Sequence, residues 1–193
     1  MKYDLTRTPT RGARRTLDAF YETLLAEVQA RSFEEVTVGS LCERAGYPRA
    51  TFYNYWDDKY DLLDYVRHRI AAMVGLNRRS EVLPQDALRT FFDRFFDVAQ
   101  AHEGFVTRLC RCNAPGGYLF ASLRLYLGGV VREAFVECAR DGHASRPVPV
   151  EMAAEQMTST VLLVLEWRFV RGHALSREQA WDALAYLLGP LAE

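Results

Sequence analysis

Apolar residues recur along this chain with the period of an α-helix in almost every segment, and the alternation typical of strands is almost absent. In the first such segment Leu17, Phe20, Leu24 and Val28 share one face. The same period predicts further helices at about residues 38–45, 49–56, 59–75, 88–99, 104–112, 118–138, 150–171 and 177–191. The pattern therefore predicts an all-α fold of about nine helices.

Two short helices separated by a glycine are predicted between residues 37 and 56. The first, residues 38–45, has its apolar positions at i, i+3, i+4 and i+7, and Thr37 stands where its hydroxyl can cap the first turn. Gly46 is expected to end this helix, because only glycine adopts the left-handed conformation there without a Cβ clash. Pro48 suits the first turn of the next helix, where its missing N–H is not needed.

The second short helix has one buried and one polar face. Phe52 and Trp56 share its core side, which leaves a small, hydrogen-bonding surface opposite. Such a surface can lie against base edges, with Arg49 suited to guanine and Asn54 to adenine. Phosphate contacts, which fix register rather than sequence, are expected from Thr51, Tyr53 and Lys59. The alternative is a helical hairpin that only packs.

These residues resemble the DNA-binding domain of the tetracycline-repressor (TetR) family of bacterial regulators. The matching motifs, within residues 14–66, are Val36-Thr37-Val38, Ala45-Gly46, Thr51-Phe52-Tyr53, Tyr55-Trp56, Asp58-Lys59 and Leu62-Leu63. Pro48 and Ala50 stand where the family commonly has a small polar residue and glycine. The resemblance implies that the DNA-contacting residues are Thr37, Arg49, Ala50, Thr51, Tyr53, Asn54, Tyr55 and Lys59.

The resemblance also implies an organisation for the whole chain. Residues 1–60 would form the helix-turn-helix domain with a basic N-terminal arm, and residues 61–193 a domain that senses an effector and dimerises. The helix at 59–75 would link them. In the family the last two helices form a four-helix bundle with a second subunit, which sets two recognition helices ~34 Å apart on a near-palindromic operator. The interface residues expected here are Val161, Leu165, Phe169, Trp181, Leu184 and Leu188.

Charge restricts where nucleic acid can bind. The 193-residue chain has a formal net charge of -1 and a pI near 6.4, so it lacks the global basic surface of a non-specific binder. Basic residues gather before the first apolar helix, at Lys2, Arg7, Arg11, Arg14 and Arg15. They fit either a flexible arm that contacts phosphates or the minor groove, or a solvated tail.

A stripe of phenylalanines in the second half is open to two interpretations. Phe92, Phe95 and Phe96 lie at helical spacing, which is typical of a core and also of a pocket for apolar ligands. If the stripe lines an effector pocket, the lining residues expected are Phe92, Phe95, Phe96, His102, Tyr118, Arg124, Tyr126 and Trp167. Because the pocket would draw side chains from several helices, its effector cannot be read from the sequence.

Other chemistry is not indicated. The four cysteines form no Cys-x-x-Cys pair and no zinc-like spacing with the histidines, so we expect neither metal nor cofactor. Cys110 and Cys112, beside Arg108, are either a redox sensor or two small helix residues. No acid, base and nucleophile spacing supports an enzyme. The polar N-terminus and the short aliphatic run 161–165 favour a cytoplasmic protein without a membrane span.

The function expected from these features is a sequence-specific, dimeric transcriptional regulator, a repressor released from its operator by a small molecule. The alternative is a regulator of the same kind whose C-terminal domain binds a protein partner.

Overall fold

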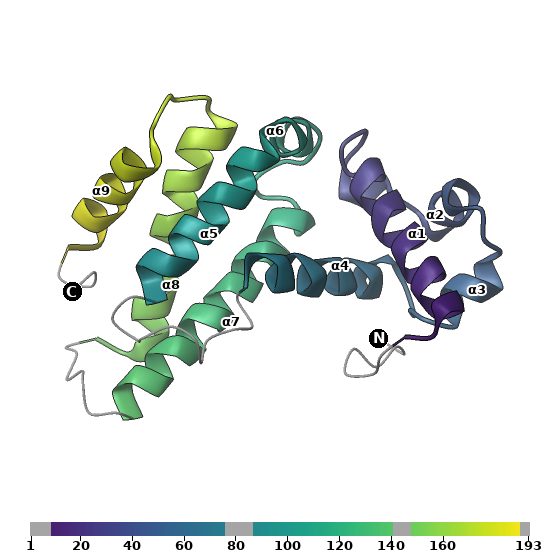
Figure 1. Cartoon of the computed structure of the whole chain (residues 1–193), viewed down its shortest axis with the longest axis horizontal. Coiled ribbons are helices and arrows are strands. Elements are labelled where there is room, and N and C mark those ends of the chain that lie inside the picture. Colours follow the sequence, from purple (N-terminus) through teal and green to yellow (C-terminus); the bar gives the residue numbers. More distant parts are fainter. Residues whose placement is uncertain (1–8, 76–86, 141–147, 190–193) are drawn as a thin grey trace. The chain divides into compact units, whose positions relative to one another are not determined.

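A computed structural model describes residues 9–75, 87–140 and 148–189. Within these ranges it has nine α-helices and no strand, which confirms the predicted all-α fold (Figure 1). A short 3₁₀ turn, η1 (Phe33–Glu35), follows the first helix, and a π-helical turn, η4 (Glu166–Val170), extends the eighth. The helices are α1 (Arg11–Glu27), α2 (Val38–Ala45), α3 (Arg49–Tyr53), α4 (Lys59–Val74), α5 (Ala87–Ala101), α6 (Glu103–Cys112), α7 (Tyr118–Arg140), α8 (Val150–Leu165) and α9 (Arg177–Leu188).

The chain forms two compact units. Unit 1 comprises residues 1–70 and 108–119, and unit 2 comprises residues 71–107 and 120–193. This division differs from the predicted boundary at residue 60, because most of α4 and the α6–α7 corner (residues 108–119) belong to unit 1. Three helices, α4, α6 and α7, therefore begin in one unit and end in the other.

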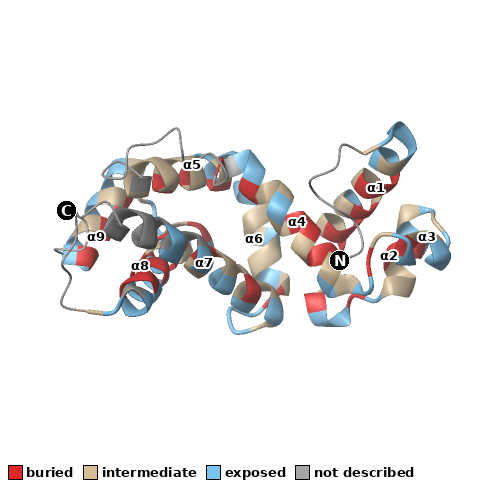
Figure 2. Cartoon of the chain, turned by 90° about the horizontal axis from the view of Figure 1, so that it is seen from below, coloured by how far each residue is buried: buried red, intermediate tan, exposed pale blue. Residues whose placement is uncertain are grey.

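Aromatic side chains form the centre of unit 1. Phe20 of α1 contacts Phe52 of α3 and Trp56 edge-on, with ring centroids 5.4 and 5.3 Å apart. All three side chains are fully buried, as is Phe33 of η1. Figure 2 shows the buried residues concentrated on one side of α1, whereas α3 is mainly exposed or intermediate. The core face predicted for α3 is confirmed.

Unit 2 has its own core, built from α5, α8, η4 and α9. The phenylalanine stripe of α5 lies in it: Phe92 and Phe96 are buried, and Phe96 packs 5.1 Å from Phe169. Helix α9 contacts both α8 and α5. Figure 1 shows α9 running beside α8.

Most residues of the predicted dimer interface lie in this core. Leu165, Phe169, Leu184 and Leu188 are buried within unit 2, and Val161 and Trp181 pack against the same cluster. The residues predicted to contact a partner are those through which α8 and α9 pack against each other and against α5. The large apolar side chains of α8, η4 and α9 that remain exposed are Met152, Leu163, Trp167, Val170, Tyr186 and Leu187.

Helix boundaries follow local capping signals. Ser176 caps α9 through the amide of Gln179, and Asp58 accepts the amides of Tyr60 and Asp61 at the start of α4. Thr10 caps α1. Because α1 already begins at Arg11, that arginine, Arg14 and Arg15 are helical and do not belong to a flexible arm.

Some predictions fall on residues outside the described ranges. These are Lys2 and Arg7 of the basic arm, the segment 76–84 that follows the helix predicted at 59–75, and residues 141–147 of the segment that precedes the helix predicted at 150–171. In the parts of the chain that the structure describes, no helix combines the length and the apolar character needed to cross a bilayer.

Candidate nucleic-acid interface

Helix α2 is fixed at both ends by its own sequence. The Thr37 hydroxyl accepts the amide of Ser40 at 3.1 Å, and the Ser40 hydroxyl accepts the amide of Thr37 at 3.2 Å, which forms a reciprocal capping box. Gly46 ends the helix in the left-handed conformation, with φ of 73°. The predicted cap and turn glycine are confirmed.

Helix α3 is only five residues long. Pro48 stands at its N-cap with φ of -61°, one position earlier than the first-turn placement predicted. One apolar side chain of α3, Phe52, is buried, and Trp56 just beyond the helix is buried beside it, with ring centroids 5.3 Å apart. The short helix is therefore anchored by an aromatic pair, and its remaining side chains face away from the core.

The predicted DNA-contacting residues are accessible in unit 1. The side chains of Thr37, Arg49, Ala50, Tyr53 and Asn54 are exposed, and those of Thr51, Tyr55 and Lys59 are half-exposed. Tyr55 also packs on Trp56 at 5.5 Å. No nucleic acid is present, so their contacts with DNA stay predictions.

Arg49 lies close against the first turn of α2. A Cβ placed on Gly39 would lie 2.7 Å from the Arg49 guanidinium nitrogen Nη2. Glycine at position 39 thus leaves room for the arginine side chain at the start of α2. The predicted base-contacting arginine and the capped helix start are adjacent in the unit.

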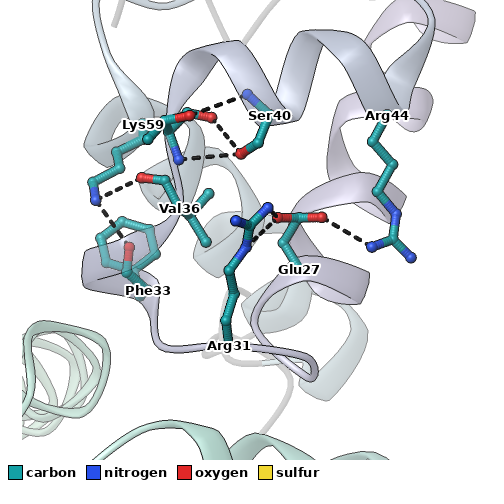
Figure 3. Close-up of polar contacts among 8 residues, drawn as sticks. Glu27, Arg31, Phe33, Val36, Ser40, Arg44 and Lys59 are labelled. Atoms are coloured by element: carbon teal, nitrogen blue, oxygen red, sulfur yellow. Dashed lines mark hydrogen bonds and ion pairs between the residues drawn. The ribbon is translucent and has the colours of Figure 1, made fainter.

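Lys59 has a role that the sequence did not suggest. Its ammonium donates to the carbonyls of Phe33, Glu34 and Val36 at 2.8–2.9 Å. Figure 3 shows the bonds to Phe33 and Val36. It also lies 4.8 Å from the Phe33 ring centroid. Burial lowers the pKa of Lys59, and Glu34 and Asp58 only partly offset this. All three N–H groups are directed at η1 and at Val36, the residue before Thr37, so Lys59 fixes the segment that leads into α2. Its contact with phosphate stays a prediction.

A buried carboxylate joins the end of α1 to α2. Glu27 accepts from Arg31 Nε at 2.7 Å and from Arg44 Nη1 of α2 at 2.9 Å (Figure 3). Its side chain is 5% exposed, whereas the two arginines are partly exposed. Burial raises the pKa of Glu27, but the hydrogen bonds from Arg31 and Arg44 outweigh burial and hold that pKa below its ordinary value.

The predicted effector residues belong to both units. Phe92 and Phe96 lie in the core of unit 2 with Phe95 packed against it, whereas Tyr118 belongs to unit 1 and stacks on Phe33. Elsewhere Arg124 pairs with Glu166, Trp167 stacks on His173, His102 is exposed and Tyr126 is half-exposed. The pocket stays a prediction. Among the described residues, no group of three or more His, Cys, Asp or Glu is placed to hold a metal ion.

Comparisons with known proteins agree with this geometry. Residues 22–66 match the family of bacterial regulatory proteins of the tetR type. No curated protein sequence matches the chain.

Solved structures share the fold over nearly the whole chain. A Syntrophomonas wolfei protein assigned to the TetR-family regulators has a TM-score of 0.67 at 16% identity, covering 93% of this chain and 95% of its own. The fatty acid degradation regulator FadR of Bacillus halodurans has a TM-score of 0.61 at 12% identity, covering 96% and 98%. FadR of Bacillus subtilis, solved with stearoyl-CoA, has a TM-score of 0.60 at 12% identity, covering 91% and 97%. The family match thus covers residues 22–66, and these structures, at 12–16% identity, show that nearly the whole chain has the fold of TetR-family regulators.

Proposed function

We propose that this chain binds double-stranded DNA through α3 and represses transcription from a near-palindromic operator. The observation that carries the proposal is the division of the α3 segment into two faces. Phe52 and Trp56 are fully buried, and Arg49, Ala50 and Asn54 are exposed. A short helix anchored on one side and polar on the other matches the requirement for reading base edges in the major groove.

The surface charge near the N-terminus supports the proposal. Arg11, Arg14 and Arg15 are exposed at the start of α1, where the first turn has no acidic residue. Cations at a helix N-terminus interact unfavourably with the helix dipole, so arginines clustered there favour the binding of an anion from outside the chain. Phosphates of the operator backbone are the anions that we propose for them.

We propose that two chains associate through α8, η4 and α9. Leu163, Trp167 and Val170 remain 43%, 40% and 39% exposed, and Tyr186 and Leu187 of α9 are exposed as well. Apolar side chains gathered on two adjacent helices are typical of a partner surface. A two-fold dimer would present two α3 helices to two half-sites whose centres lie ~10 base pairs apart.

For the effector we propose a ligand with a long apolar chain, bound by unit 2. The Bacillus subtilis FadR of the same fold was solved with stearoyl-CoA. The core of unit 2 is built from apolar and aromatic side chains, which would suit an acyl chain if α5 and α8 separate on binding.

Binding titrations test the DNA-reading proposal. The full chain is titrated with a duplex that it has itself selected from a random-sequence library, beside Arg49→Ala and Asn54→Ala. Each variant should lose about 1–3 kcal/mol of binding free energy and relax specificity at one base pair per half-site. Arg132→Ala, which removes an exposed arginine of α7 paired with Glu151, is the matched control and should bind as the unmodified chain does.

The effector proposal is tested on the same complex. Adding stearoyl-CoA should weaken binding to the selected duplex by about 5–150-fold, and free coenzyme A, which lacks the acyl chain, should not. If neither compound changes the affinity, the acyl effector is excluded. Recovery of a specific protein with the chain from native extract would then favour the alternative of a protein partner.

A further inference from the structure

We propose that Asn113, which lies outside the residues matched by the family, is a positioning residue for DNA reading. It ties the turn that leads into α2 to the α6–α7 corner. This inference rests on the proposed DNA binding. The observations that carry it are the hydrogen bonds of one buried amide and the helices on which the corner lies.

The side chain of Asn113 is 2% exposed and bonded on both of its polar atoms. Its Oδ1 accepts the amide of Phe33 at 2.8 Å, and its Nδ2 donates to the carbonyls of Val28 at 2.7 Å and Leu109 at 2.9 Å. Val28 caps the end of α1, and Phe33 begins η1. Asn113, 80 positions after Phe33, therefore bonds the Val28 carbonyl at the end of α1 and the Phe33 amide at the start of η1. Neither group has a hydrogen-bond partner within its own helix.

Further contacts hold η1 to the same corner. The amide of Tyr118 donates to Glu34 Oε1 at 2.8 Å, and the Tyr118 ring stacks on Phe33 at 5.7 Å. The hydrogen bond from the Tyr118 amide is the main reason why the pKa of Glu34 is lowered. At the end of α1, Gln29 accepts from Arg108 Nε at 2.9 Å and from the Cys112 thiol at 3.2 Å. Both ends of the connection from α1 to η1 are thus bonded to the corner.

The position of η1 determines where α2 starts. Val36 follows η1 directly and precedes the N-cap Thr37, and its carbonyl accepts the Lys59 ammonium. A shift of Phe33 therefore moves the first turn of α2, against which Arg49 lies. Asn113 acts on DNA binding through this turn and touches no base or phosphate itself.

The corner also has a covalent link to unit 2. Helix α6 enters it from residue 107 and α7 leaves it at residue 120.

Amide hydrogen exchange on the full chain tests the inference without DNA. In Asn113→Ala, exchange of residues 33–42 should rise at least about tenfold, while α8 and α9 keep their rates as internal references. Arg111→Ala removes an exposed side chain two positions away and should leave residues 33–42 unchanged. Unchanged exchange of residues 33–42 in Asn113→Ala would overturn the inference.

DNA binding supplies the second readout, on the duplex selected by the unmodified chain. Well below the unfolding temperature, Asn113→Ala should bind at least about tenfold more weakly, with a smaller dependence of log affinity on log salt, because displaced α2 residues lose phosphate contacts. A merely destabilised but folded chain would keep the salt slope. Faster exchange with unchanged affinity and slope would overturn the positioning role.

A failure of the variant to fold and a failure of the proposed DNA binding can each be recognised. If Asn113→Ala does not fold, as judged by circular dichroism, Tyr118→Ala removes the half-exposed ring stacked on Phe33 and should accelerate exchange in the same residues. If the unmodified chain selects no duplex, the proposed DNA binding fails. The inference then fails with it as a statement about DNA, while the exchange result still decides whether Asn113 holds η1.

Discussion

Three polar side chains, each bonded to at least one residue distant in sequence, hold the helix-turn-helix region in place. Glu27 joins α1 to α2, Lys59 joins the start of α4 to η1, and Asn113 joins the α6–α7 corner to both ends of the α1–η1 connection. Each lies at a junction where backbone groups lack helical partners or where two helices meet. Aromatic packing supplies the core of unit 1, and these polar residues determine its geometry.

Replacing Glu27 tests the first of these junctions. Glu27→Gln should lower the free energy of unfolding by about 1–3 kcal/mol at neutral pH, because the charge-assisted hydrogen bonds from two arginines are weakened at a buried site. Urea denaturation followed by circular dichroism measures the change. Glu35→Gln, an exposed neighbour, is the control and should stay within about 0.5 kcal/mol of the unmodified chain.

The comparison of the unmodified chain with Glu27→Gln also predicts how stability depends on pH. The pKa of Glu27 is lower in the folded than in the unfolded state, so its stabilisation is complete above the unfolded pKa and is lost as pH falls through the folded one. The stability difference between the unmodified chain and Glu27→Gln should therefore shrink on acidification below about pH 4.3. A difference that stays constant down to the folded pKa would contradict the role given to the carboxylate.

Local patterns predicted some of these residues and missed others. Phe52 and Trp56 were identified as core because helical period alone places them on one face. Asn113 falls between the helices predicted at 104–112 and 118–138 and was assigned no role, and Lys59 was predicted as a phosphate ligand. Their partners Phe33, Glu34 and Val36 lie 80 and 23–26 positions away. A contact across such a separation leaves no periodic signal in the chain.

At the scale of elements, capping and turn residues fixed most helix boundaries in advance. Thr37 caps α2 and Gly46 ends it as predicted, because such signals act within a few residues, and Asp58 and Ser176 cap α4 and α9 in the same way. The register of α8 and α9 against the rest of unit 2 was missed. Both helices are apolar on several faces, so periodicity alone could not separate the side that faces α5 from the side left exposed.

The turn between α2 and α3 gives a prediction about backbone conformation. Gly46→Ala should lower the free energy of unfolding by about 1–2 kcal/mol, because alanine resists a φ of 73° although open space surrounds the site. Thermal unfolding monitored by circular dichroism measures the loss. Gly12→Ala, in the first turn of α1 and equally unobstructed, is the matched control and should leave stability unchanged or slightly raised. Equal effects at both glycines would rule out a conformational cause.

At the scale of the whole molecule, the account requires two chains on one operator. Leu163→Arg places a charge on the exposed apolar surface of α8 and should convert the dimer to a monomer, as measured by analytical ultracentrifugation. Affinity for a duplex with two half-sites should then fall about 10²–10⁴-fold, because the two binding events are no longer linked. Leu125→Arg, at a 78% exposed position on α7, is the control and should remain dimeric. A dimeric Leu163→Arg chain would place the interface elsewhere.

Selection of duplexes from a random-sequence library by the purified full-length chain tests the central claim most directly, with the enriched sequences read by sequencing. DNA reading by α3 predicts a two-fold symmetric motif whose half-site centres lie ~10 base pairs apart, and a motif for Asn54→Ala that has lost its preference at one base pair per half-site. An enriched pool indistinguishable from the input, or the same motif selected by Asn54→Ala, would contradict DNA reading by α3.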